Sequence, residues 1–263
     1  MFARPTALLA VLCLPGAVLA QGFEYAAGTA QYRITSKTHG SQEAMGQKNE
    51  FDTSNNQLLT VTVAKQSKDT LGVTITIDSL KAVGPMGMTP PGIDKLMGVK
   101  IATKMAPYGA VYSSIGPKDD SIPQGSQVTD EISRFLPRIR AKLAPGAAWT
   151  DTTTGKISQN GVDVDRRTIA KFTVVGDTTV DGQKAWKLAR ETVTNLSGSG
   201  TTQGQPVTMG GLSQGKATLV MSQAGVFLGG LNEDQANIKI VLAANGMEIG
   251  VNTTANTTVE KVK

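Results

Sequence analysis

Histidine and cysteine are almost absent from this chain of 263 residues, which contains one of each. One cysteine excludes a disulfide framework, and so few His and Cys side chains leave too few ligands for a zinc site. Any Ser-His-Asp triad or Cys-His dyad would need His39, which lies in a polar His-Gly-Ser stretch. We expect a solvated histidine, no metal, no cofactor and a protein that is not an enzyme; a hydrolase with two carboxylates is the catalytic alternative.

Aromatic and charged residues are also scarce, at 5% and 18% of the chain. Sugar-processing clefts are usually rich in aromatic side chains, so few aromatics argue against one. The net charge of +5 is mild for this length, and basic residues do not alternate with aromatic ones. Nucleic acid is therefore not expected as a partner. The polar residues are mainly Thr, Ser, Gln and Asn, which suits extended β structure with a weakly charged surface.

Long apolar runs are missing after the N-terminus, where residues 1–20 are typical of a secretory signal. Arg4 precedes the short apolar run Ala7–Leu14, and small residues lead to a cleavage site after Ala20. Acylation of Cys13 is the alternative, but Leu12 stands where a lipoprotein signal has a small residue. We expect export to the periplasm or the medium of a bacterium, and a mature chain that does not span the membrane.

Apolar and polar residues alternate with period 2 through most of the remaining chain, which predicts amphipathic β-strands. The clearest such segments are Gln31–Thr35, Leu58–Val63, Gly72–Asp78, Val99–Lys104, Thr168–Val175, Ala185–Val193, Gly215–Met221, Ile238–Ala243 and Met247–Val251.

Turn residues separate several of these segments. Asn160-Gly161, Asp181-Gly182 and Asn245-Gly246 predict two-residue hairpin turns, because Asn, Asp and Gly tolerate positive φ. The Gly, Ser, Thr and Gln residues of Ser197–Gly211 predict a loop. The polar run Asn252–Thr258 predicts a strand at the edge of a sheet.

Helical signals are few. Thr129 is a candidate cap for a short helix through Asp130–Leu136, with Pro137 disturbing its end. Pro91–Met97 predicts one or two further helical turns, and the Gly, Pro and Met residues of Gly84–Gly92 predict a loop. The expected fold class is mainly β, with antiparallel curved sheets or a half-barrel and one or two short helices.

An internal similarity suggests two related halves. Met105–Gly109 and Met221–Gly225 each follow a strand-like stretch and each reads as strand, turn at Gly, strand. The predicted division is an N-terminal β half at 21–125, a short helical linker at 126–146 and a C-terminal β half at 147–263. The alternative is that any β protein contains such hairpins.

A family resemblance rests on the order of several turn and packing motifs. These are Thr38–Gln42, Met45–Gln47, Leu96–Val99, Leu136-Pro137, Pro145–Trp149 and Gly198–Thr201. The chain resembles a family of exported bacterial proteins known only as a domain of unknown function. Its strand-rich, two-half pattern also looks like the LolA-like lipoprotein-carrier half-barrels, which implies a curved sheet that holds acyl chains.

The candidate ligand-binding residues are three methionines in or beside one Gly/Pro loop, Met86, Met88 and Met97. Flexible thioether side chains suit a surface that adapts to apolar ligands, although they also serve as core filler. The one basic cluster, at 134–142, is a candidate contact for anionic headgroups or a solvated linker.

Two functions remain. The first is a non-catalytic envelope protein that binds a hydrophobic or amphiphilic ligand, such as a lipid or acyl chain. The second is a structural or protein-interaction module of the envelope that binds another envelope protein and no small molecule.

Overall fold

The computed structural model describes residues 22–116, 132, 134–159, 162–202, 204–243 and 246–262. Its strands are β1 (Gly28–Ala44), β2 (Gln47–Ser67), β3 (Thr70–Val83), β4 (Lys100–Met105), β5 (Val111–Ile115), β6 (Ala148–Gln159), β7 (Val162–Val180), β8 (Gln183–Thr202), β9 (Gln205–Ser222), β10 (Phe227–Leu242) and β11 (Met247–Lys261). The signal predicted at 1–20 lies outside the described residues.

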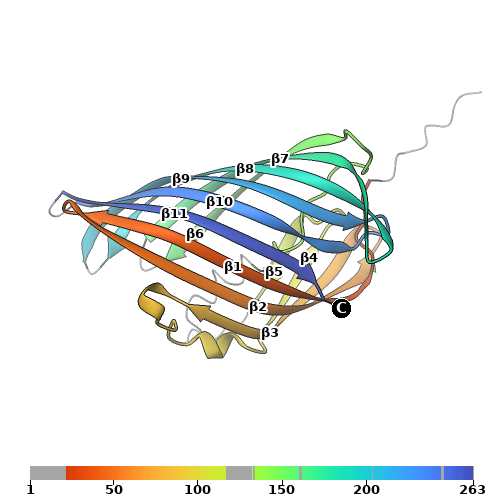
Figure 1. The fold of residues 1–263 in the computed structure, drawn as a ribbon, viewed down its shortest axis with the longest axis horizontal. Coiled ribbons are helices and arrows are strands. Elements are labelled where there is room, and N and C mark those ends of the chain that lie inside the picture. Colours follow the sequence, from red (N-terminus) through yellow and green to blue (C-terminus); the bar gives the residue numbers. More distant parts are fainter. Residues whose placement is uncertain are drawn as a thin grey trace, which may run out of the picture.

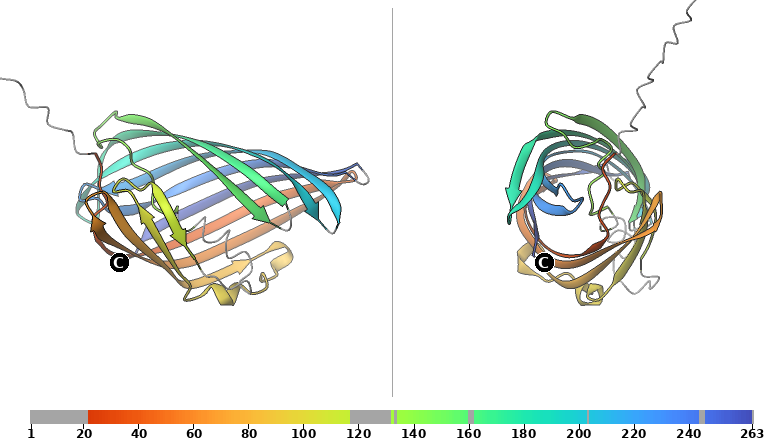
Figure 2. Two further views of the ribbon diagram at one scale, coloured as in Figure 1. Left: turned by 180° about the vertical axis from the view of Figure 1, so that it is seen from behind. Right: turned by 90° about the vertical axis from the view of Figure 1, so that its right-hand side faces the viewer.

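All these strands form one antiparallel sheet in the order β5-β4-β3-β2-β1-β11-β10-β9-β8-β7-β6. Strands β1 to β5 make one meander and β6 to β11 make another, and the two meanders join where β1 pairs with β11 (Figure 1). The sheet curls strongly, as the end view in Figure 2 shows, but β5 and β6 are its two edges and do not pair with each other. The predicted mainly β fold with a curved antiparallel sheet is confirmed.

The strands form because period-2 alternation gives each one an apolar inner row and a polar outer row. On β2, for example, Leu59, Val61 and Val63 are buried, whereas the intervening Thr62 is exposed. The strands are much longer than their apolar segments, since ladder hydrogen bonds to both neighbours extend them into stretches of Thr, Ser, Gly and Asn. The division into two halves and a linker stays a prediction.

Residues 134–147, which we call the inner strap, cover the concave face at one end of the sheet. Leu136, Ile139 and Leu143 belong to the same buried cluster as Leu59 and Phe227. We call this part of the sheet the capped end. Burial of such side chains removes apolar area from water and supplies most of the stability of the core.

Specific bonds hold the inner strap in place. The buried Tyr25 hydroxyl donates to the Pro137 carbonyl at 2.7 Å, and the Ile139 N–H donates to the Tyr108 carbonyl at 2.8 Å. Burial raises the pKa of the Tyr25 phenol well above its usual value, with a smaller contribution from Tyr32. The phenol therefore remains a hydrogen-bond donor across the ordinary pH range.

The two similar motifs of the sequence occupy equivalent turns. The Ala106 N–H donates to the Ala110 carbonyl at 2.8 Å after β4, and the Ser222 N–H donates to the Val226 carbonyl at 2.7 Å after β9. Gly109 has φ 93° in the first turn, and Gly225 has φ 86° in the second. The N-terminal residues bridge the two turns through backbone hydrogen bonds from Tyr25 and Ala26.

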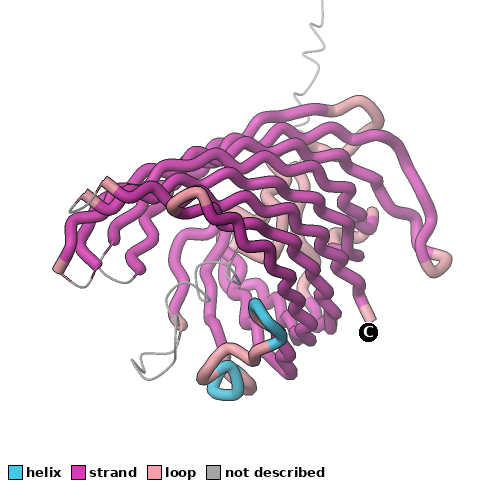
Figure 3. The backbone as a smooth tube through the Cα atoms, turned by 60° about the vertical axis from the view of Figure 1, so that its left-hand side comes forward, coloured by secondary structure: helices cyan, strands magenta, loops and turns pink. Residues whose placement is uncertain are grey.

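Two short 3-10 helices are present, η1 (Pro85–Gly87) and η2 (Ile93–Leu96). Both lie beside the sheet in the connection from β3 to β4 (Figure 3, cyan). Residues 129–131 and 133 of the other predicted helix lie outside the described residues, Ile132 is helical, and the last residues, Phe135 and Leu136, are not. The non-helical end agrees with the expected effect of Pro137, because a proline disfavours helical backbone at the residue before it.

Two sequence predictions about the sheet are wrong. Ser197–Gly211 is not a loop, since β8 continues to Thr202 and β9 begins at Gln205. Asn252–Thr258 is not at an edge, since it lies in β11 between β1 and β10. Small polar residues can continue a ladder when strands flank them on both sides, and Gly198 allows the backbone of β7 to approach closely.

The two-residue turn at Asp181-Gly182 is confirmed, with φ values of 48° and 76°. Part or all of the turns predicted at 160–161 and 245–246 lies outside the described residues. No helix in the described part of the chain is long and apolar enough to cross a membrane.

Candidate functional site: a groove on the concave face

A groove of about 520 Å³ lies on the concave face, next to the inner strap. Its lining comes from β1, β2, β3, β8, β9, β10 and β11, from η2 and from the first residues of the strap. The groove therefore depends on strands of both meanders. Its volume lies within the range of about 300–1,000 Å³ that is usual for small-molecule sites.

One side of the groove is apolar. Leu59, Ile77, Leu96, Leu219 and Phe227 line it and belong to the buried core cluster at the capped end. We call these five residues the apolar floor. An alkyl chain lying on this floor would leave water, at a gain of roughly 25 cal/mol per Å² of buried apolar surface.

The other part of the lining is polar. It begins one or two inner positions further along the same strands, with Ser36 on β1, Asn55 and Gln57 on β2, and Thr257 on β11. The Asn55 side-chain oxygen is buried and has no hydrogen-bond partner among the described residues. An amphiphilic ligand suits such a groove because its lining changes from apolar to polar along the strands.

Arg190 on β8 is the most enclosed charged group of the lining. Its guanidinium donates to the Asn232 side-chain oxygen on β10 at 2.9 Å, and Asn232 in turn donates to the Asp234 carboxylate. Burial lowers the pKa of Arg190, and the Asp234 charge partly offsets that effect. Burial also raises the pKa of Asp234, against the opposing influence of Arg190 and Asn232.

Small residues on the intervening strand make this arrangement possible. Ala217 on β9 lies between Arg190 and Asn232 in the register of the sheet, so the arginine can reach across it. Gly215 is opposite Asp234 and Thr192; a Cβ there would overlap the Asp234 carboxylate and come within 2.6 Å of the Thr192 hydroxyl oxygen. Larger side chains at 215 and 217 would separate the hydrogen-bonded side chains of Arg190, Asn232 and Asp234.

The charged side chains that line the groove are all of one sign. Arg134 and Arg190 line the groove, whereas no Asp or Glu is among its lining residues in the described part of the chain. Asp234 balances Arg190 from beyond the lining, through Asn232. Among the described residues, the charged side chains that line the groove are therefore both arginines, and the carboxylate that balances Arg190 lies outside the lining.

The predicted ligand-binding methionines do not line this groove. Met86, Met88 and Met97 lie in the β3–β4 connection, and they are 88%, 57% and 50% exposed. Their neighbour Leu96 does contribute to the apolar floor. A ligand-binding role for the three methionines stays a prediction, whereas Leu59, Ile77 and Leu219 of the apolar floor come from segments that the sequence analysis predicted as strands.

The basic cluster at 134–142 divides between two environments. Arg134 lines the groove, while Arg138 and Arg140 approach the buried carboxylate of Asp151 on β6 at 3.0 and 3.4 Å. These two arginines therefore fasten the inner strap to an edge strand. The cluster is therefore not uniformly solvated, and its contact with anionic headgroups stays a prediction.

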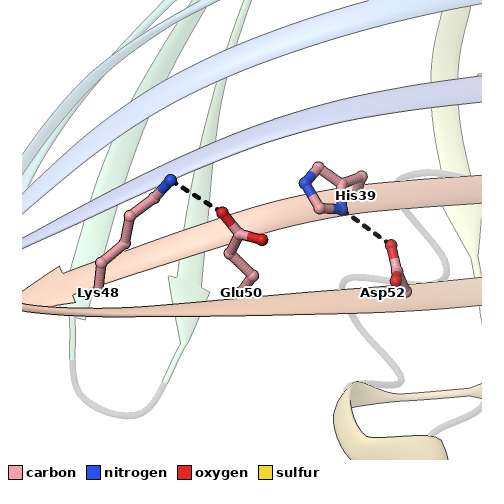
Figure 4. Close-up of polar contacts among 4 residues, drawn as sticks. All are labelled: His39, Lys48, Glu50 and Asp52. Carbon is pink, nitrogen blue, oxygen red and sulfur yellow. Dashed lines mark hydrogen bonds and ion pairs between the residues drawn. The ribbon is translucent and has the colours of Figure 1, made fainter.

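His39 is at an exposed position of β1 and does not line the groove; Figure 4 shows it beside Asp52. Its ring contacts the Asp52 carboxylate at 2.9 Å, and Lys48 pairs with Glu50 at 2.9 Å close by. The hydrogen bond and charge of Lys48, with a smaller influence of His39, lower the pKa of Glu50. All four side chains are well exposed, so these ion pairs contribute little to stability.

Among the described residues, no group of three or more His, Cys, Asp and Glu side chains is placed to hold a metal ion. Arg190, Asn232 and the small residues of β9 were not predicted as a site. The available signal was an arginine at an inner position of the alternating segment Ala185–Val193.

No family model and no curated protein matches the chain. Among solved structures, OccK2 (OpdF) of Pseudomonas aeruginosa shares 8% identity over 89% of this chain and 98% of its own, with a TM-score of 0.31. Ail, the attachment invasion locus protein of Yersinia pestis, shares 6% over 88% and 98%, with a TM-score of 0.20.

A DUF1329 family protein from Desulfovibrio piger shares 8% identity over 88% of this chain and 85% of its own, with a TM-score of 0.20. All three TM-scores are below 0.5, so these likenesses assign neither a family nor a function. The LolA-like resemblance stays a prediction.

Proposed function

We propose that this protein is an exported, non-catalytic envelope protein that holds a hydrophobic or amphiphilic ligand, such as a lipid or acyl chain, on the concave face of its sheet. The observation that carries the proposal is the groove of about 520 Å³, whose apolar floor is followed by polar lining residues further along the strands. The signal-like residues 1–20 support export.

Native mass spectrometry of the mature protein, purified without detergent from the exported fraction, tests this function. The expected result is an added mass that solvent extraction releases as a lipid. A bare polypeptide mass that does not change after incubation with envelope lipids would contradict the proposal.

A pair of variants ties the added mass to the groove. Thr38 lines the groove, and its neighbour Lys37 is exposed on the outer face of β1. Thr38→Trp should fill the groove and remove the added mass, whereas Lys37→Trp should retain it. Equal retention by both variants would place the ligand elsewhere.

A protein-interaction module is the second candidate, and the open sheet favours it. β5 and β6 each pair with one neighbour only, so one side of each strand is available for a partner strand. A photo-crosslinker at Thr152 on β6 should then give one discrete adduct in the envelope, and the same group at Thr35 in the middle of the sheet should give none.

A further inference from the structure

We propose that the groove selects anionic amphiphiles, with Arg190 receiving the carboxylate or phosphate of the head while the alkyl chain lies on the apolar floor. This inference rests on the proposed function and adds the chemical class of the ligand. Two arginines and no Asp or Glu line the groove in the described part of the chain, which favours a negative head.

The donors of Arg190 are only partly used. A guanidinium has five N–H groups in a planar fork that matches a carboxylate or phosphate. One terminal nitrogen donates to Asn232, and Nε is buried without a partner among the described residues. An anionic head would supply the acceptor that these donors lack, in a setting where a charged hydrogen bond is strong.

Asn232 and Asp234 act here as positioning residues. Asn232 accepts from the arginine and donates to Asp234, so the carboxylate does not occupy the guanidinium itself. Ala217 leaves the space that the arginine side chain crosses. The arginine is thus held in place while its charge remains available to a ligand.

The position of Arg190 on its strand fits the two parts of such a ligand. Leu188, the preceding inner residue of β8, is completely buried, and Thr192, the next inner residue, belongs to the polar region. The guanidinium therefore lies at the boundary between apolar and polar linings. The unpartnered Asn55 oxygen in the polar part of the lining offers an acceptor for a hydroxyl group of the head.

Titration calorimetry with the purified mature protein tests the charge selection. The probes are oleate, oleyl phosphate and oleyl alcohol, with acetate and inorganic phosphate as heads that lack a chain. We expect both anionic chains to bind at least about tenfold more tightly than the alcohol, as one charged hydrogen bond predicts. Comparison of oleate with oleyl phosphate distinguishes the two head chemistries, and the short anions should show no measurable binding.

Variants assign the preference to Arg190. Arg190→Gln should reduce the preference for oleate over oleyl alcohol to less than about threefold, while oleyl alcohol still binds. Arg167→Gln makes the same change at an exposed position of β7 and should leave the preference unchanged. If Arg190→Gln does not fold, the salt dependence of binding to the native protein tests the role of charge instead. Added NaCl should weaken oleate binding and leave oleyl alcohol binding unaffected.

The outcomes separate the two proposals. If oleate and oleyl alcohol bind equally at low and high salt, the anionic selection is overturned and the groove function stands. If none of the three chain probes binds, the groove function itself is overturned.

Discussion

The inner faces of the same strands differ between the capped end and the middle of the sheet. On β2, Leu59 and Val61 at the capped end are buried under the inner strap, whereas Asn55 and Gln57 in the middle are only partly buried and line the groove. On β9 the inner residues become smaller in the same direction, from Leu219 and Met221 to Gly215 and Ser213.

The contrast shows how one curved sheet can be both a core and a container. Curvature gives every strand a concave face, and at the capped end large apolar side chains and the inner strap fill it. In the middle the small and polar side chains leave space, and Arg190 crosses that space because β9 has Ala and Gly there. Packing density thus follows side-chain size along a single strand.

Truncation of a floor residue should have the largest effect. Leu59→Ala should lower the free energy of unfolding by about 2–5 kcal/mol, because it opens a cavity where the side chain is fully buried. Thr53→Ala, at an inner position of the same strand in the middle of the sheet, should change it by less than about 0.5 kcal/mol. Urea denaturation followed by circular dichroism measures both variants. Equal losses of unfolding free energy would contradict the difference in packing between the capped end and the middle of the sheet.

A larger side chain at Gly215 should affect the middle of the sheet. Gly215→Val should cost about 1–3 kcal/mol of unfolding free energy, because the new side chain overlaps Asp234 and crowds Thr192. Gly210→Val, on the same strand with no atom near its Cβ position, should be tolerated. Thermal denaturation compares the stability of the two variants. A fully stable Gly215→Val would mean that Asp234 and Thr192 can move to accommodate the new side chain.

The hydrogen bond from Tyr25 tests how firmly the inner strap is held. Tyr25→Phe should lower the free energy of unfolding by about 1–3 kcal/mol, since it leaves the Pro137 carbonyl without that donor in a buried place. Tyr112→Phe, at an exposed position on β5, is the control and should have no measurable effect. Hydrogen exchange of the Ile139 amide should also quicken in Tyr25→Phe alone.

The smallest effect concerns Asp234 and pH. Its pKa is higher in the folded chain than the usual 3.8, so the folded state binds more protons than the unfolded state. Its contribution to stability is therefore fully present below pH 3.8 and is lost as pH rises through the raised folded pKa. Asp234→Asn should remove this part of the pH dependence, and denaturant midpoints measured at intervals from pH 3 to 7 would show it. An unchanged pH profile would contradict the shift.

The predicted strands were found because alternation is a local property. Every segment with clear alternation matches a strand, although Val99 and Ala243 lie one residue outside β4 and β10, and the turn at Asp181-Gly182 has the expected positive φ values. The predictions failed where the local signal was weak: residues 197–211 were expected to be a loop but are held in strands by neighbours on both sides. No local pattern reports such neighbours.

The groove was only partly accessible from the sequence. An apolar, ligand-holding surface was an expectation, but the residues predicted for it, Met86, Met88 and Met97, do not line the groove. Arg190 and Asn232 are 42 residues apart in the chain, and they meet only because β8, β9 and β10 pair in one register. A register shift of one residue would turn either side chain to the other face.

The sequence by itself determined the strand-rich class, the inner and outer rows of each strand and the apolar content of the capped end, because period-2 alternation and side-chain hydrophobicity act within a few residues. Only the tertiary structure decided that the first and last strands pair and that residues 134–147 cover the capped end. It also decided that Arg190 reaches Asn232 across Ala217. These features depend on register and curvature, which long-range hydrogen bonding and packing select together.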